Sequence, residues 1–310
     1  MAYFRNFALF GAFIAGYFCP WASHLNWMIR WLIVGMMFMV MLQVRFSMRS
    51  IKWNHLYILL ANVAVGTGGW AVFMLFGQKE LAEVAFFTGI TPTATAAPVI
   101  VGLLGERIDF AVSAFLATNF GMACLFPFLI PVAIGNPAPT VFFDVIQSLL
   151  IVVGIPLLAA LPVRRFYKNY RELPGKLKNV SFFAWVIAIF LIIANASQFL
   201  RLQQGSIDTH LLWKIALLSA AICFVNFYFG RFIGGRRYRR EASQVLGQKN
   251  TTLTIFLALT YANPLVALGP TFYVIWHNAW NACQLQMRAV REKRKRIRAE
   301  LLLRPHGGRR

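Results

Sequence analysis

Acidic residues are scarce in this 310-residue sequence, and motifs with catalytic or metal-binding spacing are missing from it. Only 10 residues are Asp or Glu, against 31 Lys or Arg, and charged residues make up 13% of the chain. The 4 cysteines are scattered and match neither a disulfide framework nor a metal site, so we interpret them as free thiols in apolar segments. The sequence contains no nucleotide-binding loop, catalytic triad or zinc signature. These absences argue against an enzyme and against a metal or other cofactor.

Apolar sequence, by contrast, is abundant from one end of the chain to the other. Hydrophobic residues make up 59% of the chain and the mean hydropathy is +0.61, which indicates an integral membrane protein. Runs of roughly 18 or more apolar residues recur, and each is long enough to cross a hydrocarbon layer of ~30 Å as a helix. We therefore predict an all-α membrane protein with ten transmembrane helices, at about 5–22, 27–45, 54–77, 81–104, 109–134, 141–163, 180–199, 209–233, 244–266 and 268–288.

Basic residues concentrate in the loops on one side of the predicted membrane. If the N-terminus is cytoplasmic, nearly all of the 31 Lys and Arg fall in inner segments, and the outer loops keep little beyond Lys79 and Arg201. The positive-inside rule then predicts a plasma (inner) membrane protein with both termini in the cytoplasm. The formal net charge of +21 requires no nucleic acid, because such clusters set orientation and contact anionic lipids. The basic tail could instead bind RNA or another partner.

Two polar segments, about half a chain apart, interrupt the apolar pattern. They are "GITPTATAAPVI" in the fourth predicted span and "GQKNTTLT" at the start of the ninth. A helix broken at membrane depth is tolerated only where its free backbone groups face protein or a water-filled cavity. After five spans the chain is on the opposite side of the membrane, so a second repeat of five spans has inverted topology. The broken helices of the two repeats would then cross near the midplane. We expect the prolines to unwind the helix and the threonines to line the opening. The expected substrate and crossover residues are Thr91, Pro92, Thr93, Thr95, Pro98, Gln248, Asn250 and Thr251.

These segments resemble the bile acid:sodium symporter family. "TPTATAAPV" is similar to the family's fourth-span signature, and the stretch from "LGQKNTTLT" to "IWHN" is similar to its ninth and tenth spans. The resemblance covers most of the chain by topology. It implies a panel domain (1–46, helices 1–2; 140–200, helices 6–7), a core domain (50–136, helices 3–5; 208–290, helices 8–10) and a basic cytoplasmic tail (291–310). It also implies alternating-access transport of a small organic anion, bound between the two domains beside the crossover.

The sequence departs from the family at the positions that bind sodium. The family's Ser-Asn pair reads Ala97-Pro98, its acidic ligand in the ninth span aligns with Val245, and its sodium-binding Gln aligns with Lys249. Sodium needs about six hard oxygen ligands and no cation nearby. We therefore expect a sodium-independent protein in which Lys249 is a built-in cation, with partners from residues 91–98 and from Asn250. A proton-linked role for this lysine, or its extension to the headgroups, stays open.

Other polar residues in the spans have ordinary structural interpretations. Asp144 and Lys214 lie near span ends, Asn62 is a typical interhelical hydrogen-bonding residue, and His277 is expected to be packed and hydrogen-bonded. We expect a monomeric secondary transporter. Two alternatives remain open: a receptor or scaffold that kept the fold and lost transport, and a conventional sodium-coupled symporter with rearranged ligands. The sequence does not choose among organic anions.

Overall fold

The computed structural model describes residues 2–43, 52–94, 96–202 and 209–303, and these residues form helices joined by short connections. The longer elements are α1 (Ala2–Phe18), α2 (Trp27–Gln43), α3 (Trp53–Leu75), α4 (Lys79–Gly89), α5 (Ala96–Leu103), α6 (Ile108–Ala133), α7 (Pro139–Leu149), α8 (Ile155–Phe166), α10 (Lys178–Leu202), α11 (Thr209–Ile233), α12 (Arg239–Gly247), α13 (Thr251–Tyr261) and α14 (Pro264–Leu303). Short helical pieces are η1 (Pro20–Leu25), η3 (Leu150–Gly154), η4 (Tyr170–Glu172) and α9 (Leu173–Lys176).

Within the described ranges, five helical segments are long and apolar enough to cross a membrane. They are Trp53–Leu75, Ile108–Ala133, Pro139–Phe166, Asn179–Phe199 and His210–Ile233. Shorter apolar helices occur at Trp27–Met39 and Thr251–Tyr261. A helix satisfies all its interior backbone hydrogen bonds locally, which is why it suits a hydrocarbon environment. The predicted class, an α-helical membrane protein, is confirmed by these segments.

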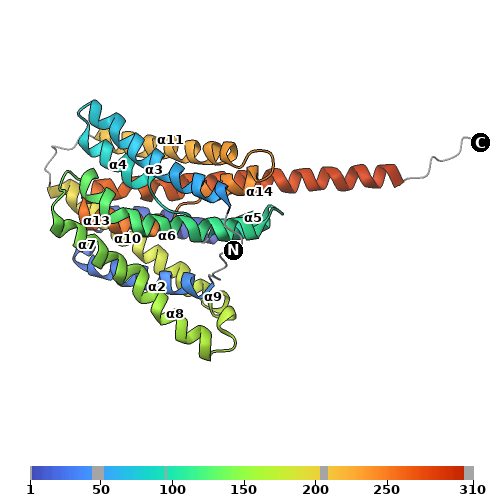
Figure 1. The fold of residues 1–310 in the computed structure, drawn as a ribbon, viewed down its shortest axis with the longest axis horizontal. Coiled ribbons are helices and arrows are strands. Elements are labelled where there is room, and N and C mark those ends of the chain that lie inside the picture. The colour runs from blue at the N-terminus through green and yellow to red at the C-terminus, as the bar shows by residue number, and fades with distance from the viewer. Residues whose placement is uncertain (1, 44–51, 95, 203–208, 304–310) are drawn as a thin grey trace, which may run out of the picture.

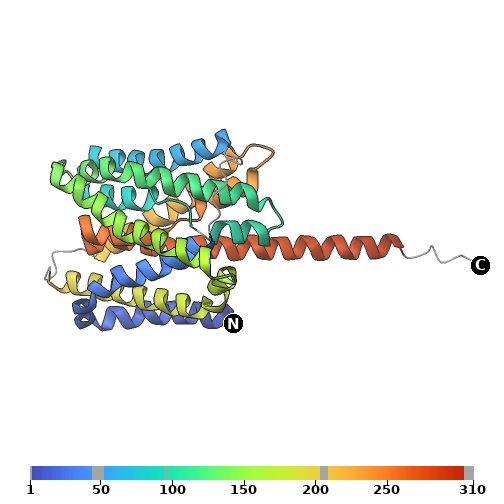
Figure 2. The ribbon, with the colours of Figure 1, turned by 60° about the horizontal axis from the view of Figure 1, so that its bottom comes forward.

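The helices form two groups with α14 between them. α2, α8 and α10 lie together on one side of the molecule, and α3, α4 and α11 lie on the other (Figure 1). α14 contacts α10 of the first group, α4 and α11 of the second, and α13. In Figure 2, as in Figure 1, the C-terminal part of α14 projects beyond the other helices. Segments from both halves of the chain therefore meet around α14.

The sixth and the last predicted spans differ from the structure in ways that bear on the fold. The sixth predicted span contains a π-helical turn, η3, between α7 and α8, and the whole segment runs over Pro139–Phe166. The last helix begins at Pro264 rather than 268 and continues to Leu303, well past the predicted start of the tail at 291. Proline fits the first turn of a helix, and the Ala, Glu, Lys, Arg and Leu residues of 288–303 are strong helix formers. The final residues, 304–310, lie outside the described part of the chain.

A pair of glycines brings α3 and α4 close together. A Cβ atom added to Gly66 of α3 would lie 2.7 Å from the Cβ of Ile90, and one added to Gly89 of α4 would lie 2.8 Å from the Cα of Gly66. Both distances are far below ordinary contact, so only glycine fits at either position. Small residues commonly allow such close packing between membrane helices. The contact places the C-terminal end of α4 directly against the middle of α3.

Candidate functional site: the helix crossover

Both segments predicted to be broken are interrupted in the structure. α4 ends at Gly89 and α5 begins at Ala96, while α12 ends at Gly247 and α13 begins at Thr251. Pro92 lies in the first gap and has no N–H to continue the helix. Pro98 lies in the first turn of α5, where no intrahelical N–H is needed. The predicted interruptions are therefore confirmed, although Thr95 lies outside the described residues.

The two interruptions meet and hydrogen-bond to each other. Thr93 and Lys249 form an isolated antiparallel β-bridge. The N–H of Ala94 donates to the carbonyl of Gln248 at 2.8 Å, and the N–H of Asn250 donates to the carbonyl of Pro92 at 2.7 Å. Unpaired backbone groups are costly away from water, and the crossing removes part of that cost for each segment. Each break is therefore stabilised by the other one.

Lys249 places its ammonium group at the end of α4. The side chain is 1% exposed, and Nζ donates to the carbonyl of Gly89 at 3.1 Å and to Oδ1 of Asn62 on α3. Gly89 is the last residue of α4, and the C-terminal end of a helix carries partial negative charge, which a cation stabilises. The buried lysine therefore does not extend to the headgroups. Among the described residues, its side-chain partners are Asn62 and Gly89, so the partners expected from 91–94, 96–98 and Asn250 were wrong; Thr95 lies outside the described residues.

The threonines of the first break tie the crossover together. Oγ1 of Thr91 lies 3.0 Å from Oγ1 of Thr254 and donates to the carbonyl of Phe87 at 2.7 Å. Oγ1 of Thr93 donates to the carbonyl of Val245 at 2.9 Å. Both threonines are 0% exposed, and neither lines the adjoining cavity. The expectation that they line the opening is corrected, because their hydroxyls already bond to protein groups.

A cavity of about 460 Å³, here called the crossover cavity, lies beside the two breaks. Its walls come from α2, α10, the α12–α13 segment and α14, together with residues around the start of α5. The lining residues are Met36, Met37, Met39, Ala94, Ala96, Ile100, Ser181, Phe182, Trp185, Gln248, Lys249, Asn250, Thr251, Thr252, His277, Asn278 and Asn281. Of the expected site residues, Lys249, Gln248, Asn250 and Thr251 thus line this space, whereas Pro92 and Pro98 do not.

α14 contributes polar groups to the cavity that the sequence interpretation had not assigned to a ligand. His277 is buried, and within the described chain its Nδ1 has no hydrogen-bond partner. Gln248 donates from Nε2 to Oδ1 of Asn281, which links the second break to α14. The sequence signal for this wall was the Trp-His-Asn pattern at Trp276 to Asn278. His277 was expected to be hydrogen-bonded, and the unpartnered nitrogen differs from that expectation.

The positions aligned with the family's sodium ligands offer few oxygen atoms. The side chains of Ala97 and Val245 are apolar and 0% exposed, and Pro98 has no polar side-chain atom. The carbonyl of Val245 already accepts a hydrogen bond from Thr93, and the carbonyl of Gly89 accepts one from Lys249. Across the described residues, no group of three or more His, Cys, Asp or Glu could hold a metal ion.

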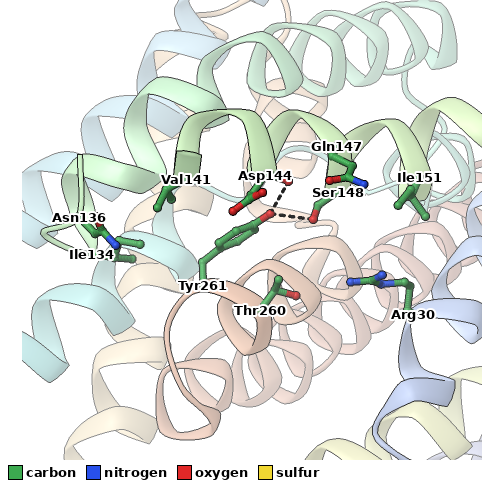
Figure 3. A pocket seen from close by; sticks show the side chains of 10 residues that line it. All are labelled: Arg30, Ile134, Asn136, Val141, Asp144, Gln147, Ser148, Ile151, Thr260 and Tyr261. Carbon is green, nitrogen blue, oxygen red and sulfur yellow. Dashed lines mark hydrogen bonds between the residues drawn. The ribbon is translucent and has the colours of Figure 1, made fainter. Parts of the chain in front are cut away.

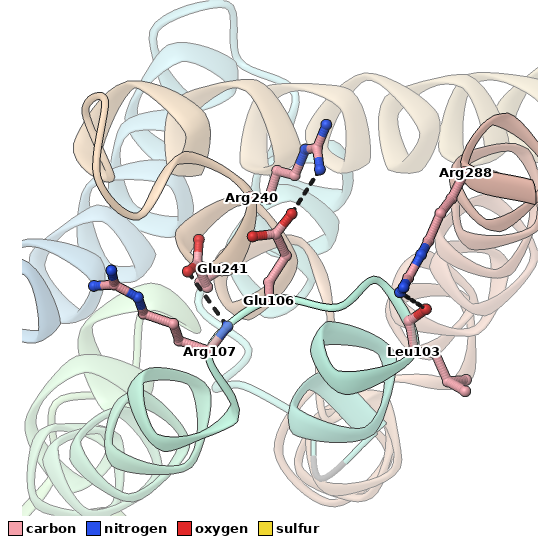
Figure 4. Close-up of polar contacts among 6 residues, drawn as sticks. All are labelled: Leu103, Glu106, Arg107, Arg240, Glu241 and Arg288. Carbon is pink, nitrogen blue, oxygen red and sulfur yellow. Dashed lines mark hydrogen bonds and ion pairs between the residues drawn. The ribbon is translucent and has the colours of Figure 1, made fainter. Parts of the chain in front are cut away.

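Polar contacts anchor the α5–α6 connection near the crossover. Nη1 of Arg240 forms a salt bridge to Oε1 of Glu106 at 2.6 Å, and the N–H of Arg107 donates to Oε1 of Glu241 at 3.4 Å (Figure 4). Nη1 of Arg288 on α14 donates to the carbonyl of Leu103 at the end of α5. These contacts attach the second half-helix of the first break to α12 and α14.

Three cations surround Tyr238 at the start of α12. Nζ of Lys52 lies 4.6 Å from the ring centroid, and the guanidinium carbons of Arg107 and Arg237 each lie 5.3 Å from it. Nζ of Lys52 also donates a hydrogen bond to the Tyr238 hydroxyl, and this bond, together with the nearby cations, lowers the pKa of Tyr238. All four residues lie in predicted inner segments, so this basic cluster has the chemistry to contact an anionic headgroup.

The crossover thus combines a cavity, a buried lysine and polar side chains of α14, brought together from distant parts of the chain. This arrangement has the chemistry to bind a small molecule with a negative or hydrogen-bonding group. The lining residues that the structure describes include no Asp or Glu. No family model matches the chain, and no curated protein matches it either.

Proposed function

We propose that the protein is a secondary transporter of a small organic anion that works by alternating access without sodium. The crossover cavity carries the proposal, because it lies where two interrupted helices meet and is bordered by α2 and α10 on one side and by α14 on another. Buried Lys249 gives this space a positive potential, and His277, Asn278 and Asn281 of α14 add polar side chains to its lining. Motion of α2 and α10 relative to the crossover would expose the cavity to one side of the membrane and then to the other.

The proposed topology has ten spans in two inverted repeats of five. The interrupted pairs α4–α5 and α12–α13 would each count as one span, and α1, α2 and α14 would complete the ten. The proposed location is the plasma (inner) membrane, with both termini in the cytoplasm and a monomer as the transporting unit. The concentration of basic residues in inner segments supports this orientation. We also propose that anionic lipids bind the cluster around Tyr238.

The first experiment is a thermal-shift screen of the purified protein against small organic acids, each with sodium and with potassium. An acid that binds is then tested for uptake into proteoliposomes. We expect at least one acid to raise the melting temperature equally in both salts, and uptake to persist in potassium. Stabilisation or uptake that requires sodium would instead support a sodium-coupled symporter with rearranged ligands.

Matched variants locate the binding site. His277→Phe removes a polar imidazole from the cavity lining, and Lys249→Met removes the amino group. We expect each to weaken acid binding at least tenfold. His24→Phe and Lys214→Met are the controls, because both residues are exposed and lie outside the cavity lining. Equal binding by cavity variants and controls would contradict the proposal.

A receptor or scaffold is the second candidate, and the projecting part of α14 favours it. This part is strongly basic, and it extends beyond the other helices as a continuous helix to Leu303 (Figure 1). Such a helix could bind a partner or a membrane surface. Acid binding without uptake in sealed proteoliposomes would support this candidate over a transporter.

A further inference from the structure

A second cavity has a volume of about 430 Å³. It lies farther along α2 and α13, which also contribute residues to the crossover cavity. Its polar lining includes Arg30 of α2, Asp144, Gln147 and Ser148 of α7, and Thr260 and Tyr261 of α13 (Figure 3). We call it the Arg30–Asp144 pocket. It shares no lining residue with the crossover cavity. Thr260 follows Thr252 by eight positions on α13, so the two sites are separated by ~12 Å along that helix.

Arg30 and Asp144 carry opposite charges on different helices and do not pair. Among the described residues neither forms a salt bridge, so their charged atoms are more than 4.0 Å apart. The guanidinium carbon of Arg30 lies 5.4 Å from the centroid of the Phe256 ring. Figure 3 shows Arg30 on one side of Thr260 and Asp144 on the other, beside the ring of Tyr261.

Tyr261 holds the walls of the pocket together. Its hydroxyl lies 2.7 Å from the Asp144 carbonyl, to which it donates, and 2.7 Å from Oγ of Ser148. These bonds use the backbone carbonyl of Asp144 and leave its carboxylate available. Ionisable residues inside predicted spans usually pair with one another. Here the two charges stand apart with neutral hydrogen-bonding side chains between them.

We propose that the Arg30–Asp144 pocket binds a small zwitterion of the amino acid type. The guanidinium of Arg30 offers a planar fork that matches a carboxylate, and the carboxylate of Asp144 accepts hydrogen bonds from an ammonium group. The amide of Gln147 on α7 and the hydroxyl of Thr260 on α13 also line the pocket. A bound anion that lacks an amine would leave the carboxylate of Asp144 without a partner. A bound amine that lacks an acid group would leave the guanidinium of Arg30 without one. The separated charges thus select molecules that carry both signs.

The volume of the pocket suits this class of ligand, since small-molecule sites usually enclose about 300–1,000 Å³. The inference does not rest on the proposed transport of an organic anion. It concerns equilibrium binding at residues that the crossover cavity does not use. A protein that failed to transport any acid could still bind a zwitterion here, and the reverse also holds.

The test uses a series of ω-amino acids in which the separation between the ammonium and carboxylate groups increases. The purified full-length protein is titrated by calorimetry with glycine, β-alanine, 4-aminobutyrate, 5-aminovalerate and 6-aminohexanoate. Butyrate and butylamine are the controls that carry one charge each. We expect one length in the series to bind best, and to bind at least tenfold more tightly than either control. Binding of butyrate or butylamine as tight as that of the best amino acid would overturn the proposal, and so would an absence of binding throughout the series.

Variants then assign the binding to the pocket. Arg30→Gln and Asp144→Asn should each lower the affinity for the best zwitterion at least tenfold, and Asp144→Asn should favour butyrate relative to butylamine. Lys214→Gln and Glu80→Gln are charge-matched controls, because both residues are exposed and lie outside the pocket. Lys249→Met should leave zwitterion affinity within about twofold, which separates this site from the crossover cavity. Unchanged affinity in Arg30→Gln and Asp144→Asn would refute the assignment, and the selectivity of the parent protein remains a test if either variant misfolds.

Discussion

The hydrogen bond between Lys249 and Asn62 is the contact on which the interpretation of a built-in cation depends most directly. In the described part of the chain, Nζ of Lys249 donates to Oδ1 of Asn62 and to the carbonyl of Gly89, and the side chain is 1% exposed. The appropriate perturbation is a pair of substitutions, Lys249→Met and Asn62→Leu, made singly and together. Methionine preserves much of the length and volume of the lysine stem, so the cycle reports on polar contacts more than on a cavity.

The expected change in the free energy of unfolding depends on which buried polar groups each variant leaves without a partner. Lys249→Met removes the donor from two buried acceptors, at about 1–3 kcal/mol each, but it also relieves the desolvation of an ammonium that has no buried carboxylate partner. These terms oppose each other, so the single variant is a poor test. Asn62→Leu, by contrast, takes an acceptor from a buried charge and should cost about 1.5–3 kcal/mol. In the Lys249→Met background the same change should cost less than about 0.5 kcal/mol, because there Oδ1 has already lost its donor.

The assay is the free energy of unfolding in mixed micelles, measured by titration with SDS and followed by the fluorescence of the 9 tryptophans. We expect a coupling energy of about 1.5–3 kcal/mol between the two positions. Lys249→Gln should lose substrate binding or stability without acquiring sodium dependence, because Ala97 and Pro98 still lack side-chain ligands. A coupling energy below about 0.5 kcal/mol, or a Lys249→Ala protein that unfolds and binds like the parent, would refute the reasoning.

Further predictions concern coupling ions, helix packing and pH. Uptake should change less than about twofold when potassium replaces sodium, and abolished uptake would contradict the loss of sodium coupling. Gly66→Ala should cost about 1–3 kcal/mol by overpacking against Ile90, whereas Gly68→Ala, which meets nothing within 4 Å, should be neutral or stabilising in the same unfolding assay. The pKa of Tyr238 is lowered in the folded state by the hydrogen bond from Lys52 and the nearby cations. Its phenolate therefore adds stability that is present above the unfolded pKa of about 10 and is lost as pH falls through the folded pKa. The stability of the parent over Tyr238→Phe should thus grow as pH rises toward about 10, and a constant difference would count against this contact.

The broken helices were predictable because their causes are local. Pro92 removes a backbone donor from the fourth predicted span, and the polar run at Gln248 to Asn250 interrupts the ninth. The partner atoms were not predictable in the same way. Asn62 lies 187 positions from Lys249, and its sequence environment resembles that of other asparagines in the spans. Asn62 lies one turn before Gly66 on the same face of α3, so the close approach of Gly66 to Gly89 places this asparagine beside the end of α4 and the amino group of Lys249.

The Arg30–Asp144 pocket was not predicted from the sequence either, because helix packing brings its residues together from distant positions. Near the end of a span, Asp144 is an ordinary polar residue, and Arg30 was counted within an apolar run. Their significance depends on which faces of α2 and α7 turn toward α13, and hydropathy along one helix does not determine that. The helical extension past 291 was missed for a different reason. Its composition favours helix, but the prediction considered only whether the segment would cross a membrane.

The interruptions also explain why length and hydropathy do not identify the fourth and ninth predicted spans as membrane-crossing helices. α4 has 11 residues and α5 has 8, so at ~1.5 Å per residue neither crosses a ~30 Å layer alone. The same holds for α12 with 9 residues and α13 with 11. Each interrupted segment leaves backbone groups without helical partners, and the bridge between Thr93 and Lys249 pairs some of them while the ammonium of Lys249 occupies the end of α4. The crossover cavity borders these breaks, so the positions of its lining groups depend on both halves of the chain. A movement of α2 and α10 relative to the crossover would change access to the cavity. The crossover itself would not have to unfold.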